Sequence, residues 1–187
     1  MSEKKKDYYH SLYEVAKVIN SSLDPAEVLQ VIARQITEAM DLKAASIRLL
    51  DSGGKRLLLG SSHGLSKGYV RKGAVEVEKS GLDREALSGT NVTIRDACSD
   101  PRFQYPEKAK EEGIASVVVV PLQIEDKSIG VLRGYSAECR EFSDDEIEFL
   151  TIIASLSAIA IENARLHQKL KLDFELQEAF EFRLFED

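Results

Sequence analysis

The chain has 187 residues, 43% of them hydrophobic, which predicts one domain of about 150 residues with terminal extensions in a soluble, cytoplasmic protein. Its formal net charge of −7 argues against nucleic acid as a partner, and no run reaches the roughly 18 consecutive apolar residues of a membrane span. Two cysteines without metal-ligand spacing, Cys98 and Cys139, are expected to be free thiols.

The N-terminal part of the chain predicts two helices. Residues 7–21 place apolar side chains at helical spacing on an otherwise polar segment, which predicts a helix with one narrow apolar stripe. A second helix is predicted from Asp24, an N-cap aspartate followed by Pro25 at the first helical position, to about Met40. Its apolar stripe is broader, so we expect it to pack on a sheet.

Extended segments dominate the middle of the chain. Residues 44–51 and 55–63 predict a hairpin, because the serine and two glycines at 52–54 form a turn sequence between them. Residues 74–77 and 91–95 predict two further strands, separated by short helices and turn-rich loops. Binding residues are commonly carried by loops on a rigid sheet, so we expect these loops to cover a pocket.

A central hairpin is predicted within residues 113–138, where two β-branched runs flank a short polar turn. On the second run, Gly130 and Gly134 fall on one face, which suits close packing of helices. Arg133 and Tyr135 fall on the other face. A guanidinium and a phenol on a strand of core quality indicate a cavity, and the alternative is that Arg133 is a rim residue.

The longest predicted helix begins at a capping box formed by Ser143 and Glu146. Apolar residues occupy most of its circumference, so one sheet cannot bury them all. We expect a homodimer assembled through this helix and the first helix; the alternative is that the first helix of the same chain covers the remaining surface. The candidate dimer-interface residues are Leu12, Val15, Ile19, Ile153, Leu156 and Ile159.

No catalytic residue or metal site is predicted. The three histidines are too scattered for a metal triad, and no glycine-rich phosphate loop occurs. The remaining hypothesis is a cavity that takes a small organic ligand, an anionic one if Arg133 points inward. The candidate ligand-binding residues are His63, Tyr69, Asp96, Phe103, Tyr105, Ser116, Val118, Arg133 and Tyr135.

A series of motifs follows along the chain: Asp100-Pro101-Arg102-Phe103, Ser116-Val117-Val118-Val119-Val120-Pro121-Leu122, Ile129-Gly130-Val131-Leu132, Phe142-Ser143-Asp144-Asp145-Glu146 and Ala160-Ile161-Glu162-Asn163-Ala164-Arg165-Leu166. In this order they closely resemble a bacterial GAF domain, over roughly residues 7 to 170. The resemblance implies an α+β fold of the GAF/PAS type, with a central antiparallel sheet of about six strands. Terminal helices would pack on one face and a loop-covered pocket would lie on the other.

The resemblance divides the chain into three parts. Residues 1–22 would be an N-terminal helix for a dimer or helical bundle, and residues 23–170 the GAF domain. Residues 171–187 would be an acidic, phenylalanine-rich extension that continues the long helix, docks onto a surface or stays disordered.

The function implied is a non-enzymatic sensory or regulatory module in signal transduction. It would bind an unknown small molecule, form a homodimer and act on a separate signalling output protein. No cofactor is expected, because the bilin-attaching cysteine is absent and no Asn-Lys pair of the cyclic-nucleotide signature occurs. Two alternatives stay open: a small redox enzyme of the free methionine sulfoxide reductase type using Cys98, and a dimerisation module with an empty pocket.

Overall fold

The computed structural model describes residues 3–22, 24–71 and 73–184, with side chains described between residues 8 and 175 of these ranges. At its centre is a six-stranded antiparallel sheet in the order β3-β2-β1-β6-β5-β4. The predicted sheet of about six strands is therefore confirmed. The strands are β1 (Ala44–Leu50), β2 (Arg56–His63), β3 (Val75–Glu76), β4 (Val92–Ile94), β5 (Ser116–Ile124) and β6 (Lys127–Ser136).

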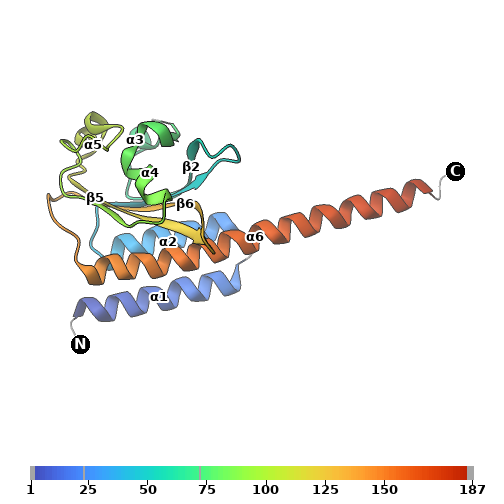
Figure 1. Ribbon diagram of the computed structural model, residues 1–187. Helices are drawn as coiled ribbons and strands as arrows, with labels where there is room; N and C mark the ends of the chain where they lie inside the picture. Colours follow the sequence, from blue (N-terminus) through green and yellow to red (C-terminus); the bar gives the residue numbers. More distant parts are fainter. Residues whose placement is uncertain (1–2, 23, 72, 185–187) are drawn as a thin grey trace.

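The terminal helices lie on one face of the sheet and the short elements on the other (Figure 1). On the helix side, α2 (Pro25–Ala39) and α6 (Asp144–Leu184) pack directly on the strands, and α1 (Glu3–Ser21) forms an outer layer against both. On the loop side lie α3 (Lys67–Val70), the 3-10 turn η1 (Val77–Lys79), α4 (Gly81–Leu87) and α5 (Pro106–Glu112). This is the arrangement that the resemblance implied.

Local sequence rules explain where the helices begin and end. The Asp24 carboxylate accepts a hydrogen bond from the Ala26 backbone N–H at 2.9 Å and caps α2. At the start of α6, the Ser143 N–H donates to the Glu146 carboxylate at 2.8 Å, and the Glu146 N–H donates to the Ser143 hydroxyl at 3.3 Å. Gly113 ends α5 with a φ of 71°, a left-handed conformation that favours glycine.

Both faces of the sheet are buried, each under its own apolar cluster. The helix-side cluster joins α1, α2 and α6 to the sheet through residues such as Ile32, Ile47 and Leu150. The loop-side cluster includes Leu82 and Tyr135. The sheet is therefore the middle layer of a sandwich, and a side chain's position along a strand decides which layer it enters.

Part of the expected dimer interface is wrong, because α1 of the same chain already covers it. Val15 and Ile153 are both 0% exposed and belong to the helix-side core, so they cannot contact a second copy. Leu12, Ile19 and Leu156 are partly buried against the same core. Among the six candidates, Ile159 retains the most exposed side chain, at 49%.

The boundary expected between residues 170 and 171 falls inside α6, which continues without a break to Leu184. Residues 171–184 thus extend the long helix; the side chains beyond residue 175, with three of the four phenylalanines of the tail, lie outside the described residues. By length and composition alone, Asp144–Glu175 could cross a membrane, which the sequence analysis did not anticipate. The buried part of this segment packs on the sheet as a core helix does, so it is weak evidence for a span.

Gly130 is predicted to be essential for the contact between β6 and β1. A Cβ atom there would clash with the Arg48 carbonyl oxygen and lie 3.1 Å from the Leu49 Cα. Gly130→Ala should therefore lower the free energy of unfolding by about 1–3 kcal/mol, measured by chemical denaturation. Gly53→Ala is the matched control, because its Cβ would meet nothing closer than the Asp51 carboxylate at 3.8 Å. Equal stability of the two variants would contradict this packing.

Candidate functional site

A group of five buried polar side chains lies between the sheet and the loop-side elements. We call it the arginine cluster: Arg48 of β1, Arg133 and Tyr135 of β6, Asp83 of α4 and Tyr69 of α3. Each is at most 3% exposed. Charged side chains are almost never fully buried unless they are paired, so this cluster is the most unusual feature of the loop side.

Strand register brings the two arginines together. Ser46 of β1 lies opposite Arg133 of β6, and Arg48 lies opposite Val131. Arg48 and Arg133 are thus diagonal neighbours on the same face, a separation that long side chains can bridge.

Arg133 and Asp83 form a buried, two-pronged ion pair. The Arg133 Nε donates to Asp83 Oδ1 at 3.1 Å, and its Nη2 donates to Oδ2. The Ser80 hydroxyl donates to Asp83 Oδ2 at 2.5 Å. Burial opposes the charged form of Arg133, but the Asp83 carboxylate, together with Tyr135 and Tyr69, outweighs burial and raises the pKa of the guanidinium above its ordinary value. Arg133 therefore points inward, as the cavity hypothesis required, but its charge is already neutralised.

Arg48 is completely buried and lacks such a partner. Its Nη1 donates to the Leu57 carbonyl oxygen at 3.4 Å, whereas Nε and Nη2 have no hydrogen-bond partner among the described residues. Burial, and then repulsion by Arg133, lower the pKa of the Arg48 guanidinium from its ordinary value. Sequence reasoning missed this residue. The available signal was one charged residue within the apolar run of β1.

The two tyrosines form the neutral wall of the arginine cluster. The Tyr135 hydroxyl lies 3.0 Å from the Ser46 hydroxyl, and the rings of Tyr69 and Tyr135 pack edge to face with centroids 6.3 Å apart. Burial, and then the neighbouring Tyr135, raise the pKa of the Tyr69 phenol above its ordinary value. Tyr69 and Tyr135 both belong to the loop-side cluster, the side on which the pocket was expected.

Phe103 and Tyr105 also lie on the loop side, beside Arg133. With Ser80 and Leu82 they line a cavity of about 10 Å³ there, which is room for about one water molecule. An organic ligand does not fit in this cavity unless the loops around it move.

Asp96 belongs to a surface turn and is exposed. Its carboxylate accepts hydrogen bonds from the Ser99 hydroxyl at 2.8 Å and the Cys98 N–H at 3.0 Å. These hydrogen bonds lower the pKa of Asp96 below its ordinary value. Asp96 therefore shapes the loop that carries Cys98. The Cys98 thiol is also exposed, and its Sγ lies 3.9 Å from the Ile114 carbonyl oxygen.

Three of the expected ligand residues lie on the wrong face of the sheet. Val118 belongs to the helix-side core, because its neighbours Val117 and Val119 take the loop side. Ser116, the first residue of β5, shares the alternation of Val118, and its hydroxyl is hydrogen-bonded to the backbone of Arg95, Glu138 and Arg140. His63 pairs with the helix-side residue Ala45.

A β-bulge explains the error at His63. The register between β1 and β2 shifts between Ile47 and Arg48, so that Gly60 has no partner on β1. An extra residue inverts the alternation of all that follows it. Leu57, before the bulge, enters the loop-side core, whereas His63, after the bulge, lies on the helix side.

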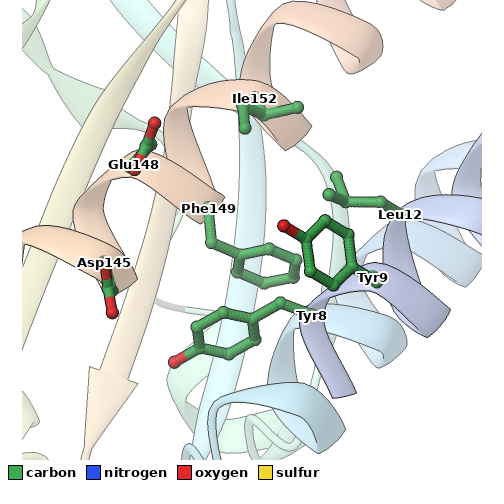
Figure 2. Close-up of a pocket in the computed structure, with 7 residues that line it drawn as sticks. All are labelled: Tyr8, Tyr9, Leu12, Asp145, Glu148, Phe149 and Ile152. Atoms are coloured by element: carbon green, nitrogen blue, oxygen red, sulfur yellow. The ribbon is translucent and has the colours of Figure 1, made fainter. Parts of the chain in front are cut away.

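The larger hollows lie away from the arginine cluster. One of about 140 Å³ opens between α1 and α6, where Tyr8 stacks on Phe149 with centroids 4.4 Å apart (Figure 2). Its lining is Tyr8, Tyr9, Leu12, Asp145, Glu148, Phe149 and Ile152. Within the described part of the chain, no group of three His, Cys, Asp or Glu side chains could hold a metal ion.

A six-stranded antiparallel sheet with terminal helices on one face and a loop-covered polar cluster on the other defines the class of the protein, a three-layer α+β domain. A family model described as the GAF domain matches residues 22–162, and the chain belongs to this family. The predicted resemblance is confirmed. GAF domains of this kind occur in regulatory and sensory proteins.

Curated relatives include two regulators. The chain is 26% identical over 182 residues to the Nif-specific regulatory protein of Herbaspirillum seropedicae, with 89% of this chain and 33% of that protein covered. It is 25% identical over 174 residues to the formate hydrogenlyase transcriptional activator of Escherichia coli, with 89% of this chain and 25% of that protein covered. The chain thus spans between a quarter and a third of the length of these relatives.

Solved structures agree on the fold. The GAF domain of an Acinetobacter phosphoenolpyruvate-protein phosphotransferase superposes with a TM-score of 0.73 at 25% identity, covering 89% of this chain and 97% of that one. A free methionine-R-sulfoxide reductase from Neisseria meningitidis, in complex with its substrate, superposes with a TM-score of 0.74 at 21% identity. The superposition covers 89% of this chain and 95% of that one. The second likeness shows the fold alone.

The ion pair between Arg133 and Asp83 can be tested by removing its acidic partner. Asp83→Asn leaves the Arg133 charge buried without a carboxylate, so we expect it to lower the free energy of unfolding by about 3–5 kcal/mol. Glu85→Gln is the matched control on the same helix, because Glu85 forms an exposed ion pair with Arg102 at 3.1 Å and should cost less than about 1 kcal/mol. Denaturant titrations measure both, and similar losses in the two variants would contradict the special role of the buried pair.

Proposed function

We propose that the chain is a non-enzymatic sensory or regulatory module of a cytoplasmic signalling system. It binds a small molecule on the loop side of the sheet and self-associates through α1 and α6. The observation that carries this proposal is α6 itself, a helix of 41 residues that begins in the core and continues far beyond the sheet (Figure 1). Such a helix offers both a surface for a second copy and a rigid connection to an output.

Between Ile152 and Leu170, the exposed apolar residues of α6 follow the spacing of a coiled coil. Ile152, Ile159 and Leu166 are seven residues apart and between 41% and 49% exposed. Between and after them, at alternating steps of three and four residues, come Leu156, Asn163 and Leu170. A heptad seam of this kind favours pairing of helices, and a single polar residue such as Asn163 within it favours one register and one oligomeric state. We call these six residues the α6 seam.

α1 contributes to the same surface. Tyr9 and Tyr13 are 63% and 64% exposed, and Tyr9 lines the hollow that also contains Ile152 of the α6 seam (Figure 2). Exposed apolar surface that continues from one helix to the next is typical of an interaction site. A second copy of this chain is the occupant we propose, because the same heptad seam on both copies is self-complementary about a two-fold axis.

Contacts within the domain connect the loop side to α6. Asp83 of α4 is paired with Arg133 of β6, β6 is paired with β5 along its whole length, and α6 packs on β5. A ligand that moves α4 would therefore act on the strands beneath α6. The regulators among the relatives favour an output that lies in another region or in a separate signalling protein.

A second candidate is a dimerisation module whose pocket takes no ligand. The closed loop-side cavity of about 10 Å³ favours it. The redox alternative has less support, because the likeness to the reductase is a likeness of fold at 21% identity. Cys98 is one exposed thiol in a surface turn.

Self-association is tested by placing a charge in the α6 seam. Ile159→Glu should convert a dimer into a monomer in light scattering coupled to gel filtration, with little change in circular dichroism, because Ile159 is half exposed in the single chain. Gln168→Glu adds the same charge on an exposed position outside the seam and should leave the dimer intact. An unmutated protein that stays monomeric at all concentrations would refute the proposal.

The redox alternative has its own test. Neither the unmutated protein nor Cys98→Ser is expected to reduce free methionine sulfoxide when dithiothreitol supplies the electrons, measured as methionine formed. Cys139→Ser is the matched control, since Cys139 is the other exposed thiol. Activity that disappears in Cys98→Ser and persists in Cys139→Ser would establish the enzyme instead.

A further inference from the structure

We propose that Arg48 is the anchor of a binding site for a compact, planar monoanion, a carboxylate or an oxyanion of the same shape. The inference rests on the proposed function, a small molecule bound on the loop side, and names its chemical class. Its basis is the geometry of the arginine cluster. The site would use the Nε and Nη2 hydrogens of Arg48, which have no partner among the described residues.

The charges of the cluster do not balance. Two guanidinium groups, Arg48 and Arg133, face one carboxylate, Asp83. That carboxylate is held by Arg133 through both oxygens and by the Ser80 hydroxyl. Arg48 stays protonated even when buried, because a guanidinium does not lose its proton in proteins. One positive charge is left over at a position that is 0% exposed, and a buried unpaired charge is strongly unfavourable.

Arg133 shows which shape of anion a guanidinium of this cluster binds. Its Nε and Nη2 atoms, on one edge of the guanidinium, bind the two oxygens of Asp83. On Arg48 the same edge, Nε with Nη2, is the one without a partner. This edge matches two oxygens of a planar anion, such as a carboxylate, better than it matches a spherical ion.

No acidic side chain among the described residues fills this role. Glu112 is the other carboxylate whose charge acts on the cluster, through Tyr69. Its two oxygens accept hydrogen bonds from Ser66, from the N–H at 2.7 Å and from the hydroxyl at 2.5 Å. Glu112 is thus committed to the start of α3.

The surroundings of the arginine cluster limit the size of the ligand. The cavity on the Arg133 side of the cluster measures about 10 Å³, and Tyr69 and Tyr135 close the cluster with their rings. This cavity has room for about one water molecule, so even a head group of three or four heavy atoms requires these side chains to shift. A larger metabolite would place its carboxylate on Arg48 and displace α4 or the segment around Phe103.

The test is thermal unfolding in the presence of minimal anions. Sodium formate and sodium acetate are titrated at constant ionic strength, with formamide and acetamide as neutral counterparts of the same shape and sodium nitrate as an inorganic planar anion. The anions should raise the Tm of the unmutated protein saturably, by roughly 3–6 °C at ten times the dissociation constant. The amides should not. Stabilisation by formate and acetate but not by nitrate would identify an organic carboxylate as the ligand. Stabilisation by all three would identify a site that also accepts inorganic planar anions.

Two arginine variants separate the site from general charge effects. In Arg48→Met the rise in Tm with anion should disappear, while the Tm without anion should equal or exceed that of the unmutated protein, since an unpaired buried charge is removed. In the control Arg56→Met the rise should persist, because Arg56 is exposed and paired with Asp51 at 3.0 Å. A Tm that rises equally in Arg48→Met overturns the proposal.

A measurement on the unmutated protein tests the site even if the Arg48 variant fails to fold. Titration with formate should shift the side-chain Nε–H resonance of Arg48 in nitrogen-15 NMR spectra, and formamide should leave it in place. An unmoved resonance with no rise in Tm overturns the anion site. A neutral metabolite that stabilises the protein, or a dimer that depends on Ile159, would still support the proposed function, so the two failures are distinguishable.

Discussion

The ion pair between Arg133 and Asp83 fixes the loop-side layer to the sheet. α4 is only seven residues long, and the sheet holds it through the apolar contacts of Leu82 and Ala86 together with this pair. Burying two charges is close to neutral for overall stability, but separating them inside the protein is costly. The pair therefore acts as a latch that holds α4 on the sheet with Asp83 seated on Arg133.

Arg48 makes that latch sensitive to charge. Arg48 and Arg133 lie on neighbouring strands and repel each other, and this repulsion grows when α4 covers them and excludes water, so it opposes the closed state. An anion on Arg48 would relieve this repulsion and stabilise the seated position of α4. A ligand can shift a conformational equilibrium only by its difference in affinity for the two states, and a second negative charge beside two cations provides such a difference.

Local rules predicted the elements well and their faces less well. The caps of α2 and α6 depend on neighbours in sequence, so Asp24 and the pair of Ser143 with Glu146 could be identified from the sequence. The faces depend on strand register. Gly60 inverts the alternation of β2, and no local signal distinguishes it from other glycines. The ion pair joins residues that are 50 positions apart in the sequence. Arg48 is recognised as an unpaired charge only once the structure shows that Asp83 is already paired with Arg133.

The geometry of α6 determines how an event on the loop side could leave the domain. Leu150, Ile153 and Ala158 are buried against the rest of the chain, while Ile152 and Ile159 of the α6 seam point outward from the same turns. The two stripes belong to one continuous helix with about 100° between successive residues, so they cannot move independently. A shift of β5 under the buried stripe must therefore turn or tilt the seam as well. Coiled-coil packing accepts discrete registers, so in the proposed dimer a small displacement at the sheet would favour one arrangement of the two α6 helices over another.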